Sequence, residues 1–201
     1  MLNNRDYTLI IDASSSMSTL DQAEGKSRWA VIQENTLALA RKCEQLDSDG
    51  LTVYIFSNSF KRYDHVMASQ VQQIFQENEP QGGTNLTIVL QDAFNKYFQR
   101  KATGQAKPQG ETILVITDGD PDDRIGVADA IVHASKRMER DEELAISFIQ
   151  VGSDAKVTKS LKAFDDQLHG IGAKFDIVDT VTIDDMEDIT LAEVLLNAIV
   201  D

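Results

Sequence analysis

Short apolar runs alternate along this chain with longer segments in which apolar residues recur every three to four positions. Runs of five to eight mostly apolar residues predict strands buried in a core, and the three-to-four spacing predicts amphipathic helices. The expected strands are Tyr7–Asp12, Leu51–Phe56, Thr112–Thr117, Leu144–Val151 and Phe175–Asp179. The expected helices are Ser27–Leu46, Val71–Phe75, Leu86–Arg100, Ile125–Arg140, Lys156–Leu168 and Thr190–Val200.

This alternation of strands and helices predicts the fold class. It is typical of an α/β protein, in which a mostly parallel sheet carries helices on both faces. The segment KRYDHVM, residues 61–67, follows the second strand after only a few residues. So short a link predicts an antiparallel hairpin, because a parallel neighbour needs a long crossover. No linker or repeat interrupts the pattern, so we expect one domain over residues 1–201.

Composition and charge narrow the classes of partner. Hydrophobic residues make up 42% of the chain, which is typical of a soluble globular domain. The net charge of −14 argues against nucleic acids and anionic membranes, which attract basic surfaces. The single cysteine, Cys43, cannot form an internal disulfide. Together with an N-terminal segment that does not resemble a signal peptide, this predicts a cytoplasmic protein.

Polar residues gather where two expected strands end. DASSS, which follows the apolar run YTLII, places oxygen atoms at alternate positions in Asp12, Ser14 and Ser16. Asp118 follows the strand TILVIT, and the loop QGGTNL presents Thr84. In open α/β sheets, ligands bind at the carboxyl ends of the strands where the strand order reverses. These five residues would surround one point with hard oxygen ligands, which suit Mg²⁺, Mn²⁺ or Ca²⁺.

Ordinary turn chemistry can explain each residue separately. Asp and Ser are common turn formers, Thr84 could cap the following helix, and Asp118 could form a turn with Gly119. The acids Asp120, Asp122 and Asp123 fit either the rim of a site or a solvated loop. Two strand ends and one loop that supply matching oxygens together favour the metal site. Its two formal negative charges would leave the cation able to attract another carboxylate.

The pieces Asp12-x-Ser14-x-Ser16, Thr84 and Thr117-Asp118-Gly119 resemble the metal-ion-dependent adhesion site (MIDAS) of a von Willebrand factor type A (VWA) domain. The resemblance covers essentially the whole chain. It implies a Rossmann-like, doubly wound sheet of about six strands with one antiparallel edge strand. It also implies Mg²⁺ held by the five residues, with the sixth position taken by water or a partner's Glu or Asp. The stretches GKSRWAVIQE and ITDGDPDD are similar to stand-alone intracellular bacterial members, some of them linked to stress responses.

The leading hypothesis is therefore a non-enzymatic adaptor or scaffold that binds an acidic residue of a protein partner through a divalent cation. The alternative is a Mg²⁺-dependent phosphohydrolase, which would place a second acid where this chain has Ser14. A third role is a metal that only stabilises the fold. The sequence leaves the partner, the choice of cation and the oligomeric state open.

Overall fold

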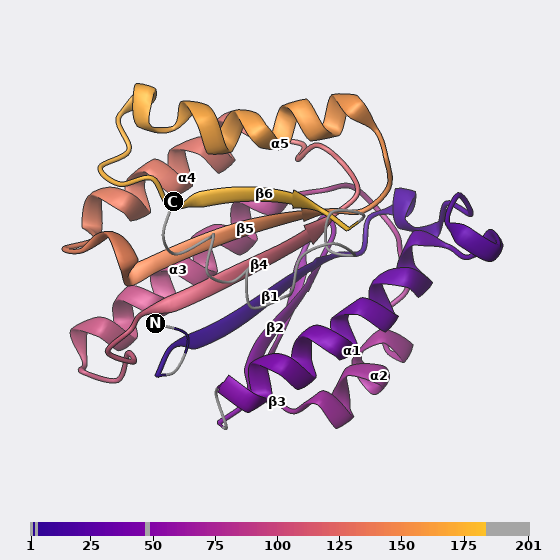
Figure 1. The fold of residues 1–201 in the computed structure, drawn as a ribbon, viewed down its shortest axis with the longest axis horizontal. Helices are drawn as coiled ribbons and strands as arrows, with labels where there is room; N and C mark the ends of the chain where they lie inside the picture. Colours follow the sequence, from indigo (N-terminus) through magenta and orange to yellow (C-terminus); the bar gives the residue numbers. More distant parts are fainter. Residues whose placement is uncertain (1, 3, 47–48, 184–201) are drawn as a thin grey trace.

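The computed structural model describes residues 2, 4–46 and 49–183, and in this part of the chain six strands form one sheet (Figure 1). The strand order is β3-β2-β1-β4-β5-β6. Among these described strands, only the β2–β3 pair is antiparallel. The strands are β1 (Asp6–Asp12), β2 (Leu51–Phe56), β3 (Phe60–Val66), β4 (Glu111–Thr117), β5 (Leu144–Gln150) and β6 (Val178–Thr182). The predicted α/β class, the mostly parallel sheet and the antiparallel edge strand are confirmed.

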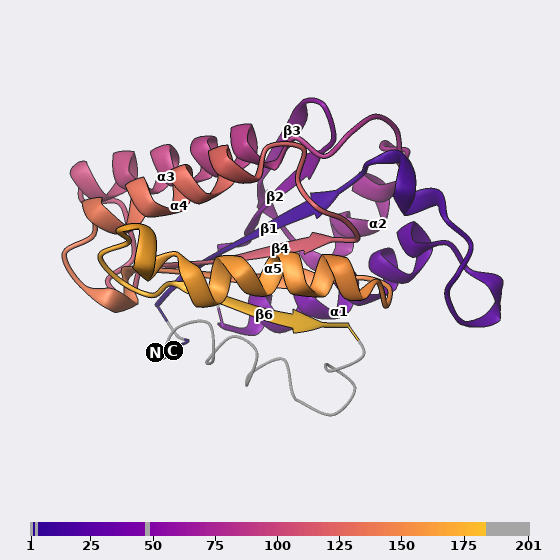
Figure 2. The ribbon, with the colours of Figure 1, turned by 90° about the horizontal axis from the view of Figure 1, so that it is seen from above.

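Five helices of the described chain cover the sheet, which Figure 2 shows from above. Helices α1 and α2 pack on one face, and α3, α4 and α5 pack on the other. Their bounds are α1 (Arg28–Leu46), α2 (Ala68–Gln76), α3 (Leu86–Ala102), α4 (Arg124–Arg137) and α5 (Ala155–Gln167). The predicted helix at 190–200 and the acidic turn before it lie outside the described residues.

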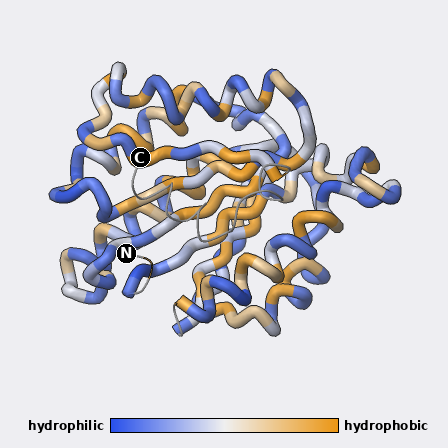
Figure 3. The backbone as a smooth tube through the Cα atoms, viewed as in Figure 1, coloured by the Kyte–Doolittle hydropathy of each residue, from blue (hydrophilic) through white to orange (hydrophobic). Residues whose placement is uncertain are grey.

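The central strands form the core because both of their faces are covered. In β1, Leu9 and Ile11 contribute to the cluster under α1 and α2, while Ile10 contributes to the cluster under α3–α5. A strand covered on both faces needs a continuous apolar run rather than an alternating one. Figure 3 shows this pattern as hydrophobic central strands surrounded by helices of mixed hydropathy. The edge strand β3 has mostly polar residues, which suits its solvent-facing side.

The amino ends of the strands are held together by a buried arginine. Arg5 donates hydrogen bonds to the Thr112 hydroxyl at 2.6 Å and to the backbone carbonyls of Glu142 at 2.6 Å and Glu111 at 2.9 Å. Burial lowers the pKa of Arg5 to about 10. The bonds of Arg5 therefore stabilise this end of the sheet, whereas the candidate ligand residues lie at the opposite, carboxyl edge.

Candidate functional site

The strand order brings two aspartates to the same point of the carboxyl edge. β1 ends at Asp12 and is paired with β2 on one side and with β4 on the other, so the order of the strands reverses beside it. Asp118 directly follows β4. Because β1 and β4 are parallel neighbours, their carboxyl ends meet, as the sequence predicted. Both side chains are buried.

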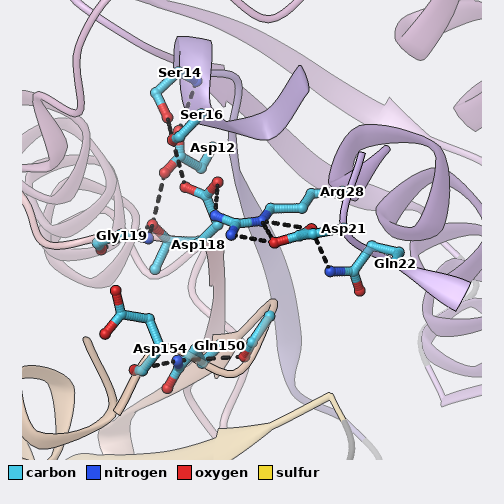
Figure 4. A network of polar contacts seen from close by, with 12 residues as sticks. Asp12, Ser14, Ser16, Asp21, Gln22, Arg28, Asp118, Gly119, Gln150 and Asp154 are labelled. Atoms are coloured by element: carbon cyan, nitrogen blue, oxygen red, sulfur yellow. Dashed lines mark hydrogen bonds and ion pairs between the residues drawn. The ribbon is translucent and has the colours of Figure 1, made fainter. Parts of the chain in front are cut away.

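The DASSS segment links these aspartates through a chain of oxygen atoms (Figure 4). The Ser14 N–H donates to Asp12 Oδ1 at 2.7 Å. The Ser14 and Ser16 hydroxyl oxygens lie 3.0 Å apart, and the Ser16 hydroxyl donates to Asp118 Oδ1 at 2.8 Å. Ser16 Oγ thus contacts Ser14 Oγ on one side and Asp118 Oδ1 on the other, and Ser14 is bonded to Asp12. The structure brings four of the five predicted residues together.

Asp12 is fixed from the neighbouring strand. The Thr117 hydroxyl donates to Asp12 Oδ2 at 2.6 Å, and the Gly119 N–H approaches Thr117 Oγ1 at 3.3 Å. Burial raises the pKa of Asp12 to about 6, against the lowering effect of the bonds from Thr117 and Ser14. The charge of Asp118 contributes to the rise. The hydrogen bonds to Asp12 thus offset only part of the free energy that burial of its negative charge costs.

The fifth predicted residue, Thr84, lies in a loop that backbone hydrogen bonds hold against the DASSS segment. The Ser15 N–H donates to the Gly82 carbonyl at 3.1 Å, and the Gln81 N–H to the Ala13 carbonyl at 2.8 Å, so the loop lies against DASSS. The Thr84 N–H donates to Asp122 Oδ2 at 2.8 Å, and the Asp122 N–H returns a bond to the Thr84 carbonyl at 3.0 Å. These bonds tie Thr84 to the loop that carries Asp118.

Gly83 allows this close approach between loops. A Cβ atom at Gly83 would come within 2.6 Å of Asp122 Oδ2, which is closer than real contacts allow. Asp122 therefore has a positioning role that sequence reasoning did not assign. Its neighbour Asp123 caps α4 by accepting from the Gly126 N–H at 2.8 Å, while Asp120 is exposed.

Arg28 is the second residue that sequence reasoning missed. Its Nη1 lies 2.8 Å from Asp118 Oδ2, and its Nε lies 3.1 Å from both carboxylate oxygens of Asp21 (Figure 4). The bonds from Arg28 lower the pKa of Asp21 to about 2. The same bonds raise the pKa of Arg28, with the Asp21 bond as the largest cause. Arg28 begins α1, where Ser27 accepts from the Ala30 N–H at 3.1 Å as the predicted cap.

The composition of the site differs from a usual metal cluster. Within residues 2, 4–46 and 49–183, no three His, Cys, Asp or Glu side chains form a group that could hold a metal ion. The candidate site combines two carboxylates with hydroxyl groups, and the guanidinium of Arg28 already contacts one of the carboxylates. Across the same described residues, no helix is long and apolar enough to cross a membrane.

Three solved structures share the fold of this chain at low identity. The PilB minor pilin from Streptococcus sanguinis, in a mutant form, matches with a TM-score of 0.61 at 13% identity. The pilus adhesin SpaC from Lactobacillus rhamnosus GG matches with 0.55 at 15%, and proximal thread matrix protein 1 from the mussel byssus with 0.52 at 16%. Each match covers 98% of this chain, which spans 60%, 30% and 47% of the respective chains. No protein-family model and no curated protein sequence matches.

These findings correct the predicted family. The matching structures are a minor pilin, a pilus adhesin and a byssus protein, and no family model supports a VWA domain or its stand-alone intracellular bacterial type. That prediction is wrong. Its motifs are short, and local contacts account for part of them, because Asp12 accepts from its own turn and Asp118 is paired with Arg28. The geometry of the site, rather than a family assignment, is therefore the basis for assigning a function.

Proposed function

We propose that this chain binds a protein partner through a divalent cation, Mg²⁺ first and Mn²⁺ or Ca²⁺ as alternatives. Asp12, Ser14, Ser16, Thr84 and Asp118 would hold the cation, and an Asp or Glu of the partner would complete its coordination. The observation that carries this proposal is the contact between hydroxyl and carboxylate oxygens at the point where β1 and β4 end.

The spacing of these oxygens supports a small cation. An octahedral shell with Mg–O distances of about 2.1 Å places neighbouring ligand oxygens about 3 Å apart. Ser14 Oγ and Ser16 Oγ are 3.0 Å apart, and Ser16 Oγ and Asp118 Oδ1 are 2.8 Å apart. The oxygens therefore have the separation that ligands of one ion need.

The balance of charge supports a divalent ion. Three carboxylates, of Asp12, Asp118 and Asp21, and the guanidinium of Arg28 give a local sum of −2. Two positive charges would neutralise this group. The raised pKa of Asp12 also supports a bound cation, because a nearby positive charge stabilises an ionised carboxylate that is buried.

The residues of this chain prepare the binding geometry. Thr117 fixes one oxygen of Asp12, and the Ser14 N–H fixes the other. Arg28 holds Asp118 Oδ2, which leaves Oδ1 directed toward Ser16. When bound, the cation would supply an open position for a partner carboxylate. Hydroxyl ligands are neutral, so this position would stay attractive to a negative charge.

A binding role is preferred over the phosphohydrolase alternative. Ser14 stands where that chemistry would need a second acid, and its hydroxyl contacts Ser16. The cytoplasmic location, the doubly wound description of the sheet and the exclusion of nucleic acids and membranes stay predictions. Two of the matching structures are named as pilus proteins, so a place on the cell surface is the competing location for this chain.

The relaxation of water protons by Mn²⁺ tests the proposal. We expect one Mn²⁺ to bind the chelator-stripped protein and to keep at least one exchangeable water. Millimolar N-acetylglutamate amide should displace this water and reduce the relaxation, whereas the glutamine analogue should not. Asp118→Asn should abolish Mn²⁺ binding, while Ser15→Ala, which changes an exposed serine of the same turn, should retain it. Equal effects of the two analogues would contradict the proposal.

A further inference from the structure

A second surface with its own charge pattern lies along α5. Figures 1 and 2 show this helix beside β6, at the end of the sheet. A groove of about 820 Å³ runs between α5 and the loop that leads from β4 to α4. Its charged lining consists of four cations and two anions: Arg124, Lys156, Lys159, Lys162, Asp120 and Asp166. The groove therefore has a charge sum of +2 on a chain whose net charge is −14.

The four cations of the groove differ from several other basic residues in how they are paired. Lys26, Lys101 and Lys107 each form ion pairs, with Glu34, Glu143 and Asp49 respectively. In the part of the chain that the structure describes, no ion pair involves a cation of the groove. Lys156, Lys159 and Lys162 follow one another at intervals of three residues along α5. Their positive charge is thus available to a ligand.

Arg124 and Ser160 add further polar groups to the lining of the groove. Arg124 lies over the Phe164 ring, with Cζ 5.8 Å from its centroid, and Nη2 is 3.4 Å from the Ser160 carbonyl. Ser160 lines the groove and is only 4% exposed, and its hydroxyl has no hydrogen-bond partner among the described residues. This oxygen is itself enclosed, so Ser160 forms part of the wall of the groove rather than a contact for a ligand.

We propose that this groove binds a short acidic segment of a protein partner, rich in Asp or Glu. Carboxylates complement the lysine row and can accept hydrogen bonds from Arg124. The short basic stretch suits a short ligand, because a long nucleic acid would extend over the acidic remainder of the surface. Asp120 joins the groove to the Asp118 loop, so one partner could reach both sites. Binding in the groove itself needs no cation and is independent of the proposed metal site.

Fluorescein-labelled hexaglutamate provides the test probe, measured by anisotropy at low salt with EDTA present. We expect saturable binding that weakens at least tenfold in the Lys159→Glu/Lys162→Glu double variant and falls as salt is added. The control Arg41→Glu/Lys61→Glu makes the same change in charge at exposed residues of α1 and β3 and should bind as the wild type does. Circular dichroism verifies that both variants are folded.

Three results would overturn the proposal. The first is no saturable binding to the wild type, and the second is an equal loss in both double variants. The third is equally tight binding of an oligothymidylate with the same number of charges, which would point to nucleic acid as the ligand. Asp12→Asn should leave hexaglutamate binding unchanged, so the groove and the metal site can fail separately.

Discussion

Replacing Asp12 with asparagine should stabilise the cation-free protein at neutral pH. Burial is the main reason that the pKa of Asp12 rises from 3.8 to about 6. Each tenfold change in proton affinity corresponds to about 1.4 kcal/mol, so the ionised carboxylate costs the folded state about 3 kcal/mol above pH 6. An asparagine removes this charge. It keeps the bond from the Ser14 N–H, and its amide can donate to Thr117 Oγ1, whose proton can turn to the Gly119 carbonyl.

The sign of the pH dependence is set by the raised pKa. Between pH 3.8 and 6 the folded state binds more protons than the unfolded state, so the free energy of unfolding of the wild type falls as the pH rises through this window. We expect Asp12→Asn to be about 1–3 kcal/mol more stable than the wild type at pH 7.5, with little difference near pH 4. Urea denaturation in EDTA at both pH values measures this difference.

Asp21→Asn is the matched control, because it makes the same chemical change with the opposite expected sign. The bonds from Arg28 lower the pKa of Asp21 to about 2, so its ionised form contributes stability above pH 3.8 that is lost as the pH falls through 2. Removing this charge should destabilise the protein at pH 7.5. If Asp12→Asn were instead less stable than the wild type at pH 7.5, the folded protein would stabilise the negative charge of Asp12. Burial would then not destabilise the ionised carboxylate.

Three further changes probe the site and its support. Arg28→Gln removes a positive charge beside Asp118 and also the bond that positions Asp118 Oδ2. We expect the lost repulsion to outweigh the lost positioning, so Mg²⁺ binding should tighten about tenfold in calorimetry, and weaker binding would show that the positioning dominates. Asp122→Ala removes the acceptor of the Thr84 N–H. Hydrogen exchange of that amide should become faster, and Mg²⁺ binding should weaken several-fold. Unchanged exchange would refute the positioning role of Asp122. Arg5→Met removes a buried charge and the hydrogen bonds that the backbone carbonyls of Glu142 and Glu111 accept at the far end of the sheet. It should cost about 3–5 kcal/mol in urea denaturation without changing Mg²⁺ affinity, and a loss of affinity would contradict the separation of the two ends.

Much of the fold could be predicted because its signals are local. The strands β1, β2 and β4 contain mostly apolar runs without strict alternation, since both faces of a central strand are covered. The sequence pattern predicted the bounds of the edge strand β6 and of the short helix α2 less well. The predicted strand Phe175–Asp179 is instead β6, Val178–Thr182, because its register is set by pairing with β5, from Ile146 opposite Val178 onward. Helix α2 begins earlier than predicted, at Ala68, where Gln70 accepts a hydrogen bond from the Met67 N–H.

The site could be predicted only in part, because several of its contacts join residues that are far apart in the sequence. Asp12 and Asp118 were found because each lies at the end of a strand, and neighbouring parallel strands end together. Arg28 lies 90 residues from Asp118 in sequence, and its ion pair depends on the tertiary fold, which places the first residue of α1 next to the residue that follows β4. No local pattern predicts such a pair. The link between Thr84 and Asp122 likewise arises from the approach of two loops across 38 residues.

Calorimetric titration of Mg²⁺ into the chelator-stripped protein is the decisive experiment for the proposed cation site. We expect binding of one ion to the folded wild type at pH 7.5 and no binding to Asp118→Asn, which removes the charge of a buried carboxylate of the site and with it the ion pair to Arg28. Wild-type protein that is folded but binds no Mg²⁺, Mn²⁺ or Ca²⁺, or an Asp118→Asn variant that binds as tightly as the wild type, would contradict the proposal.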